Sequence, residues 1–194
     1  MNDQHSTLLL ASASPRRREL LAGLGLTFEV LAADVDETLR HGEPPDAAVL
    51  RLAADKAETG ARHRTDAVVL GADTLVTLAG RIFGKPRDAA QAGAMLRELS
   101  GRTHRVWTGV AVARAGSPTV RRAAVAEVTF KELSAAEIAA YLDTGEPLDK
   151  AGAYAIQGRA SAFVTELRGE LSTVIGLPMS VARELLQGAG VVLG

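Results

Sequence analysis

The chain has 194 residues, no cysteine and a formal net charge of −1 at pH 7. The near-neutral charge argues against a general electrostatic attraction to nucleic acid or to a membrane surface, and the missing cysteine excludes disulfides, thiolate metal sites and a cysteine nucleophile. No apolar run approaches the roughly 20 residues of a membrane-spanning helix, and residues 1–11 lack the basic segment of a secretory signal. We therefore expect a cytoplasmic protein forming one domain, residues 1–194, with two lobes.

The first half of the chain alternates apolar runs with amphipathic stretches. Residues 67–72 (AVVLGA) form a continuous apolar run, which is typical of a strand covered on both faces. The predicted elements are strands at 7–11, 27–33 and 67–72, helices at about 15–24 and 46–62, and a hairpin over 74–83 that continues the third strand.

The second half predicts two long antiparallel strands between helices. Ser134 caps one of these helices, and Glu137 three residues later completes a capping box. The predicted elements are helices at 88–99, 134–143 and 178–187, strands at 104–116 and 119–133, a loop at 145–159 and a hairpin over 161–176. Helices that interleave with strands and hairpins indicate an α/β fold with a mixed, twisted sheet.

A run of three arginines stands at the start of the first predicted helix, directly after Ser14, its predicted N-cap. Arg16 and Arg17 precede the apolar stripe at 20–24 by one turn, so they should face the body of the protein. Together with the hydroxyls of Ser12 and Ser14 and the free N–H groups of the first turn, they suit a phosphate chain. The alternative is a solvated helix start whose arginines pair with nearby acids.

Two charged residues fall on apolar elements. Lys56 follows Leu52 by four positions, on the buried face of its helix, and needs a carboxylate or phosphate partner unless it reaches past the edge of the stripe to solvent. Asp73 directly follows the apolar run at 67–72, where ligand crevices of α/β sheets open. A carboxylate there can hold a divalent cation or accept a proton from water, or it can simply cap a turn.

Other polar residues give weaker signals. Lys85 in GKPRD is a phosphate ligand or a surface charge, and it is not part of a P-loop because Ala79 and Pro86 break that pattern. Gln157 lies in a glycine-containing loop, where its amide could contact the edge of a nucleotide base. The four histidines show no metal-ligand spacing, which argues against zinc.

Three acids, Asp34, Asp36 and Glu37, lie in a loop after a predicted strand. Most such acids are solvated. One of them could complete a metal site with Asp73, because magnesium that is bound through a nucleotide needs only one or two carboxylates.

Eight segments together resemble the Maf family of nucleoside triphosphate pyrophosphatases. No single motif decides the matter, but the set occurs in order along essentially the whole chain. The segments are LASASPRRRELL (10–21), VDET (35–38), RLAADKA (51–57), LGADTLV (70–76), GKPRD (84–88), LSGRTHRVWTGVAV (99–112), LDKAGAYAIQG (148–158) and VIGLP (174–178).

The resemblance implies an elongated, two-lobed fold with a central cleft, like that of the inosine triphosphate pyrophosphatases, and often a homodimer. It implies hydrolysis of a nucleoside triphosphate to the monophosphate and pyrophosphate with a divalent cation. By this likeness Asp73 is the proton acceptor, while Arg16, Thr74 and Gln157 match the branch that acts on dTTP and UTP. Glu37, Lys56 and Lys85 match other polar positions of the family site.

The resulting hypothesis is a pyrophosphatase for dTTP and UTP that removes non-canonical or excess nucleotides. Ser12, Ser14, Arg16, Arg17, Thr74 and Gln157 would bind the substrate. Asp73, Lys56 and Lys85 would act in catalysis, and Asp73 with Glu37 would hold Mg²⁺, or Mn²⁺ or Co²⁺ in its place. Two alternatives stay open: a pyrophosphatase for modified nucleotides such as 7-methyl-GTP, and a non-enzymatic nucleotide-binding regulator of septum formation.

Overall fold

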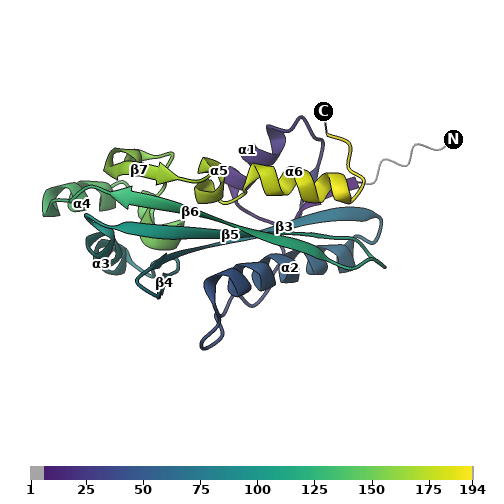
Figure 1. The fold of residues 1–194 in the computed structure, drawn as a ribbon, viewed down its shortest axis with the longest axis horizontal. Helices are drawn as coiled ribbons and strands as arrows, with labels where there is room; N and C mark the ends of the chain where they lie inside the picture. Colours follow the sequence, from purple (N-terminus) through teal and green to yellow (C-terminus); the bar gives the residue numbers. More distant parts are fainter. Residues whose placement is uncertain (1–6, 194) are drawn as a thin grey trace. The chain divides into compact units, whose positions relative to one another are not determined.

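The computed structural model describes residues 7–193, and Figure 1 shows how its helices and strands are arranged. The strands are β1 (Thr7–Leu10), β2 (Glu29–Val30), β3 (Ala67–Leu78), β4 (Arg81–Phe83), β5 (Thr103–Ala113), β6 (Val120–Phe130) and β7 (Val164–Arg168). The α-helices are α1 (Pro15–Ala22), α2 (Pro45–His63), α3 (Ala89–Leu99), α4 (Ala135–Leu142), α5 (Leu171–Ile175) and α6 (Met179–Gly188). Three short 3₁₀ turns are η1 (Glu146–Asp149), η2 (Ala151–Ala153) and η3 (Arg159–Phe163).

The strands pair in the order β2-β1-β3-β5-β6-β7, with β4 paired to β3. β1 runs parallel to both β2 and β3, whereas the β3–β4 and β6–β7 pairs are antiparallel. The predicted α/β class with a mixed sheet is therefore confirmed.

The chain forms two compact units. Among the described residues, unit 1 comprises 7–73, 108–124 and 176–193, and unit 2 comprises 74–107 and 125–175. The strands β3, β5 and β6 each contribute residues to both units. The prediction of one domain over residues 1–194 stays a prediction.

In unit 1, alternate residues of the parallel strands enter two separate hydrophobic cores. Leu9 and Val69 pack with α2, whereas Leu8, Leu10 and Val68 pack with α1 and α6. Figure 1 shows α2 on one face of the sheet and α6 on the other. Because both faces are covered, the strands read as continuous apolar runs rather than as alternating ones.

Glycines let α2 approach the sheet closely. A Cβ atom added to Gly71 on β3 would lie 2.3 Å from the carbonyl oxygen of Ala53 and 2.8 Å from the backbone nitrogen of Ala57. A Cβ on Gly109 of β5 would lie 2.3 Å from the carbonyl oxygen of Val49. The backbone of α2 therefore packs directly on the strands, and this contact fixes the position of the side chains that α2 presents.

In unit 2, a single core joins the second half of β3 to α3, α4 and the 3₁₀ turns. Its aromatic members stack edge to face, with Phe130 4.9 Å from both His104 and Tyr154 between ring centroids. His104 is 1 % exposed, and its Nε2 lies 2.8 Å from the Tyr154 hydroxyl.

Two elements differ from the prediction. The strand expected at 27–33 is limited to Glu29–Val30. The hairpin expected over 74–83 as a continuation of the third strand is confirmed, because β3 runs through Asp73 to Leu78 and pairs antiparallel with β4.

The sequence predicts a second hairpin over 161–176. The prediction of its second strand is wrong, because residues 171–175 form the helix α5. Their β-branched residues favour a strand, but the backbone N–H of Thr173 donates to the carbonyl of Glu170 (3.0 Å) and starts a helical turn.

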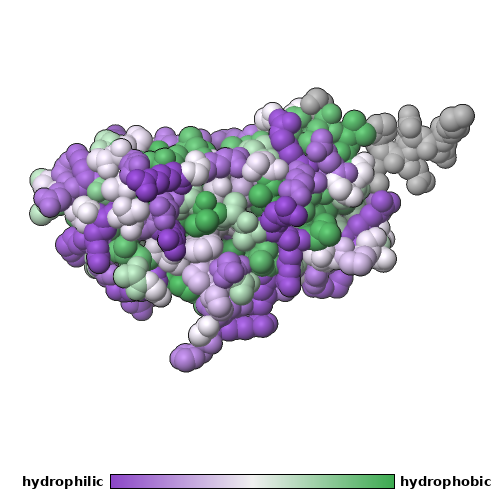
Figure 2. Space-filling view, in the orientation of Figure 1, coloured by the Kyte–Doolittle hydropathy of each residue, from purple (hydrophilic) through white to green (hydrophobic). Residues whose placement is uncertain are grey.

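The surface is mixed in polarity. Figure 2 shows hydrophilic and hydrophobic side chains interspersed over one face of the molecule. Within residues 7–193, no helix has both the length and the apolar character needed to cross a membrane.

Candidate active site

The first helix begins as the sequence predicts. Ser14 is the N-cap of α1, its hydroxyl accepts a hydrogen bond from the backbone N–H of Arg17 (3.5 Å), and Pro15 occupies the first turn. Ser12 is buried beside it, and its hydroxyl accepts a hydrogen bond from the Ser14 N–H (3.3 Å). This start of α1 presents backbone donors and two hydroxyls at a position that follows β1 directly.

The three arginines differ in exposure. Arg18 is exposed, Arg16 is half-buried, and Arg17 turns inward, where its Nε donates to the carbonyl of Gly176 (2.8 Å) and its Nη1 to the hydroxyl of Ser12 (3.2 Å). The sequence placed Arg16 and Arg17 on the inner side and Arg18 elsewhere, and the structure agrees. The carbonyl of Gly176, in the VIGLP segment, is an anchor that the sequence did not reveal as one.

The guanidinium of Arg17 interacts electrostatically with the carboxylates of Asp73 and Glu37. Burial lowers the pKa of the Arg17 guanidinium, while the negative charges of Asp73 and Glu37 oppose that shift and the positive charge of Arg16 adds to it. The Arg17 guanidinium therefore lies within electrostatic range of these two carboxylates.

Lys56 is buried and paired. Its Nζ lies 2.6 Å from Oδ1 of Asp73 and 2.6 Å from Oε1 of Glu37, and its side chain is only 8 % exposed. Of the two alternatives for Lys56, a carboxylate partner is therefore correct, and the side chain does not reach past the helix to solvent. A buried ammonium is stable here because two carboxylates compensate its loss of hydration.

Asp73 reaches this position because of where the parallel pairing ends. β1 pairs with β3 through Leu70, and the N–H of Ala11 donates to the carbonyl of Leu70 (2.8 Å). After Ala11 the chain leaves the sheet and leads into α1. β3 instead continues past Leu70 to Asp73, which is 7 % exposed. The carboxylate thus lies beyond the end of the parallel ladder, as the rule for α/β sheets predicts.

The donor set suits a divalent cation that is shared with a substrate. Within residues 7–193, no group of three or more His, Cys, Asp or Glu side chains is arranged to hold a metal. Asp73 and Glu37 nevertheless converge on one ammonium, so their carboxylates lie close together. Two carboxylates with phosphate oxygens and water are the hard oxygen ligands that Mg²⁺ prefers.

The remaining predicted residues belong to unit 2. Thr74 follows Asp73 on β3 and is half-buried, whereas Lys85 and Gln157 are exposed in loops. The two loops are linked, because the N–H of Gly152 donates to the carbonyl of Gly84 (3.1 Å). The structure therefore joins Arg17 to Ser12, joins Lys56 to Asp73 and Glu37, and places Arg17 within electrostatic range of both carboxylates. Thr74, Lys85 and Gln157 belong to the other unit.

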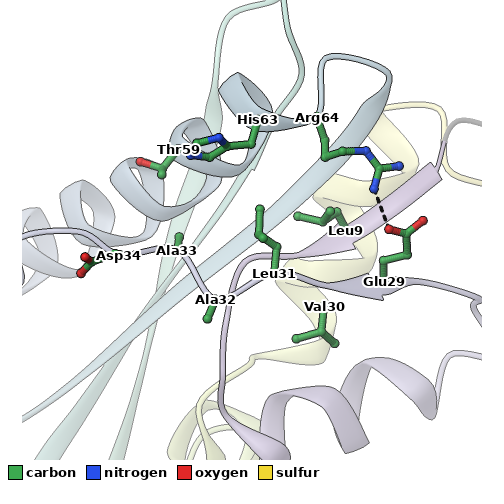
Figure 3. Close-up of a pocket in the computed structure, with 10 residues that line it drawn as sticks. All are labelled: Leu9, Glu29, Val30, Leu31, Ala32, Ala33, Asp34, Thr59, His63 and Arg64. Carbon is green, nitrogen blue, oxygen red and sulfur yellow. Dashed lines mark hydrogen bonds and ion pairs between the residues drawn. The ribbon is translucent and has the colours of Figure 1, made fainter.

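Described residues of unit 1 also line two cavities. Figure 3 shows the smaller one, of about 410 Å³, which is lined by apolar residues such as Leu9 and Leu31 with the Arg64–Glu29 ion pair among its lining side chains. A second cavity of about 540 Å³ is lined mostly by charged side chains around Arg51 and Asp55. The side chains of Lys56, Asp73 and Arg17 line neither cavity.

A comparison of sequences decides the family. The model of the Maf family, described as Maf-like protein, matches residues 7–189. The chain belongs to the Maf family. The resemblance seen in its motifs is thereby confirmed over nearly the whole length.

Curated Maf relatives are similar over their full length. A dTTP/UTP pyrophosphatase of Myxococcus xanthus (strain DK1622) is 51 % identical over 193 residues, covering 100 % of this chain and 97 % of the relative. A dTTP/UTP pyrophosphatase of Anaeromyxobacter dehalogenans (strain 2CP-C) is 53 % identical over 186 residues, covering 94 % of each.

A solved structure shares the fold of this Maf chain. The Staphylococcus aureus Ham1 protein superposes with a TM-score of 0.54 at 14 % identity, covering 94 % of this chain and 99 % of that one. This solved structure therefore supports the mixed α/β fold described above.

Proposed function

We propose that this Maf protein hydrolyses the pyrimidine nucleoside triphosphates dTTP and UTP to the monophosphate and pyrophosphate. The observation that carries the proposal is the buried Lys56, held between Asp73 and Glu37, in a chain about half identical to relatives named dTTP/UTP pyrophosphatase. Such a charge arrangement has no evident structural purpose on α2, because apolar residues could fill the same space at lower cost.

In the proposed reaction, a water molecule attacks the α-phosphorus, and a new P–O bond forms as the bond between the α-phosphorus and the bridging oxygen to the β-phosphate breaks. The water's proton passes to the Asp73 carboxylate, and pyrophosphate leaves with the electron pair of the broken bond. Lys56 orients Asp73 through the 2.6 Å contact to Oδ1. Arg16, Arg17, Lys85 and the first-turn N–H groups of α1 would bind the phosphates, so placement and charge neutralisation supply most of the rate.

A divalent cation fits this scheme at Asp73 and Glu37, with Mg²⁺ as the proposed ion and Mn²⁺ or Co²⁺ as substitutes. Bound there, it would neutralise part of the triphosphate charge and draw electrons from the phosphorus. Its ligands from the protein would be these two carboxylates alone, and the substrate would supply the other charged oxygens.

The proposed selection of the base depends on Thr74 and Gln157. A carboxamide can donate to a ring carbonyl oxygen and accept from the imide N–H, a pattern that uracil and thymine share. Discrimination against the extra methyl group of thymine could favour UTP over dTTP by only about 1–3 kcal/mol. Use of both dTTP and UTP is therefore expected.

A panel of triphosphates tests the proposal directly. Pyrophosphate release is measured with dTTP, UTP, CTP, GTP and 7-methyl-GTP, each with and without Mg²⁺. Cation-dependent release from dTTP and UTP supports the proposal, and preference for 7-methyl-GTP would support the modified-nucleotide alternative instead. Binding without turnover for every nucleotide would favour the regulator of septum formation.

We further propose that the protein forms a homodimer and is located in the cytoplasm. Light scattering of the purified full chain tests the first, and fractionation of cells that express it tests the second.

A further inference from the structure

The loop that carries Gln157 is held at both ends by side chains from elsewhere in unit 2. The backbone N–H of Ala155 donates to the hydroxyl of Tyr141 (3.0 Å), and the backbone N–H of Arg159 donates to Oε2 of Glu146 (3.3 Å). Gln157 lies midway between these two anchors and is exposed.

The two anchors are also joined to each other. The Tyr141 hydroxyl donates to Oε1 of Glu146 (2.8 Å), so one phenol both accepts from the loop and donates to the second anchor. Tyr141 is 3 % exposed, and its ring packs edge to face on Phe163 with centroids 5.2 Å apart. Burial raises the pKa of the Tyr141 phenol above its ordinary value.

Glu146 is fixed by its own backbone. Its N–H donates to the hydroxyl of Thr144 (3.1 Å), which in turn donates to the carbonyl of Tyr141 (2.6 Å). The carbonyl of Glu146 accepts from Nζ of Lys150 (2.8 Å). The carboxylate is therefore held in one place relative to Tyr141.

The loop lies directly against this carboxylate. A Cβ atom added to Gly158 would lie 2.1 Å from Oε1 of Glu146, a distance that no side chain can occupy. Gly158 has φ −98°, which other residues also adopt, so the close approach to Glu146 explains the glycine here and not its backbone conformation.

We propose that Tyr141 and Glu146 are positioning residues for base selection, acting together as a clamp that fixes the Ala155–Arg159 loop and with it the Gln157 carboxamide. The inference rests on the proposed function, in which Gln157 contacts the pyrimidine. A carboxamide discriminates uracil from cytosine only while its oxygen and nitrogen keep a fixed orientation, because it presents a donor and an acceptor side by side. Loss of the clamp should therefore weaken discrimination more than it slows chemistry.

The test compares UTP with CTP as substrates of the full-length protein with Mg²⁺. Tyr141→Phe keeps the buried ring but removes the hydroxyl and both of its hydrogen bonds. The ratio of kcat/KM for UTP over CTP should fall by about five- to tenfold, the effect expected for losing the one neutral hydrogen bond that the loop donates to Tyr141. The change should reside in the KM for UTP, with kcat at saturation within about twofold of wild type.

A second variant tests the same contact independently, in case Tyr141→Phe does not fold. Gly158→Ala leaves Tyr141 intact but displaces the Glu146 carboxylate, and it should give the same loss of discrimination. Glu146→Gln, which retains an acceptor for Arg159 and a contact to Tyr141, should keep more discrimination than Glu146→Ala.

Ser100→Ala is the matched control, because it removes one hydrogen bond (Leu133 N–H to Ser100 Oγ, 2.7 Å) from the same unit without touching the loop. It should lower the melting temperature to a similar extent and leave the UTP to CTP ratio unchanged. Folded Tyr141→Phe and Gly158→Ala variants with wild-type discrimination would overturn the clamp while leaving the pyrophosphatase proposal intact. A wild-type protein that hydrolyses neither UTP nor dTTP would overturn both.

Discussion

The ammonium of Lys56 lies 2.6 Å from the carboxylate of Asp73, and both side chains are buried. Lys56 belongs to α2 and Asp73 to β3, and the two elements meet through Gly71 without an intervening side chain. The same ammonium contacts Glu37 in the loop that precedes α2. Packing of the helix on the strand thus sets the charge arrangement on which the proposed chemistry depends.

Replacing Lys56 with Met should leave Asp73 as a buried carboxylate without its counter-charge. We expect the free energy of unfolding to fall by about 3 kcal/mol, the usual cost of removing one partner of a buried pair, and pyrophosphate release to be lost. Addition of Mg²⁺ should recover part of that stability, because a cation bound at Asp73 and Glu37 replaces part of the positive charge that Lys56 supplied.

Urea titrations of Lys56→Met with and without Mg²⁺ measure this effect. The double variant Lys56→Met/Asp73→Asn, which removes both charges, should be more stable than Lys56→Met alone. If the single variant is as stable as wild type, Lys56 and Asp73 are not the coupled buried pair described above.

Gly71→Ala should displace α2 from β3. The added Cβ would lie 2.3 Å from the Ala53 carbonyl oxygen, so the helix must shift and carry Lys56 with it. We expect a loss of about 1–3 kcal/mol in unfolding free energy, typical of overpacking, together with reduced kcat.

Gly188→Ala on α6 is the control for Gly71→Ala, because an added Cβ there meets nothing within 4 Å. It should keep wild-type stability and activity in the same denaturation and turnover assays. Wild-type kcat in a folded Gly71→Ala protein would show that the Lys56–Asp73 geometry does not depend on this close contact.

Arg17→Lys should impair triphosphate binding. Lysine keeps the charge but cannot donate to both the Gly176 carbonyl and the Ser12 hydroxyl in the forked geometry of the guanidinium. The KM for dTTP should rise by about tenfold or more, the usual cost of losing one charged hydrogen bond. The neighbouring exposed Arg18→Lys should leave KM unchanged in steady-state assays, and equal behaviour of the two variants would exclude a specific role for Arg17.

His104 should make stability fall in mild acid. Burial lowers the pKa of His104 to about 4, whereas an unfolded chain keeps the ordinary value of 6.5. Below pH 6.5 the unfolded chain therefore takes up a proton that the folded protein refuses, and stability is lost progressively as the pH falls towards about 4. The full loss is on the order of 3 kcal/mol, with no contribution above neutral pH.

Unfolding free energies of wild type and His104→Gln at pH 7.5 and pH 4.5 isolate this contribution. The difference between the two pH values should be smaller in His104→Gln than in wild type, whereas the exposed His63→Gln should behave like wild type. An equally steep dependence in His104→Gln would contradict the assignment.

The sequence was most informative where local rules act. Ser14 and Pro15 correctly predict the start of α1, and Ser134 with Glu137 forms the predicted capping box of α4. The contact between Lys56 and Asp73 is different, because its partners are 17 positions apart and each was assigned only by its own apolar surroundings. Periodicity could show that Lys56 lies on a buried face, but not which carboxylate it meets.

Tertiary contacts explain what sequence reasoning missed. Residues 171–175 look like a strand by composition, yet they fold as α5. The role of the Gly176 carbonyl as an anchor for Arg17 leaves no trace in side-chain chemistry, because a backbone oxygen is present at every residue. Likewise Tyr141 and Glu146 carry no sequence signal as a pair, since only the fold brings them to the ends of the Gln157 loop.

The most direct test is the rate of pyrophosphate release from dTTP and UTP by Asp73→Asn with Mg²⁺. Asparagine retains the shape of the side chain and an oxygen that accepts from Lys56, but it cannot take the proton of the attacking water. We predict a fall of at least about 100-fold in kcat, the lower end of what a general base contributes, with nucleotide binding still measurable. Turnover within about twofold of wild type would contradict the role of Asp73 and the mechanism built on it.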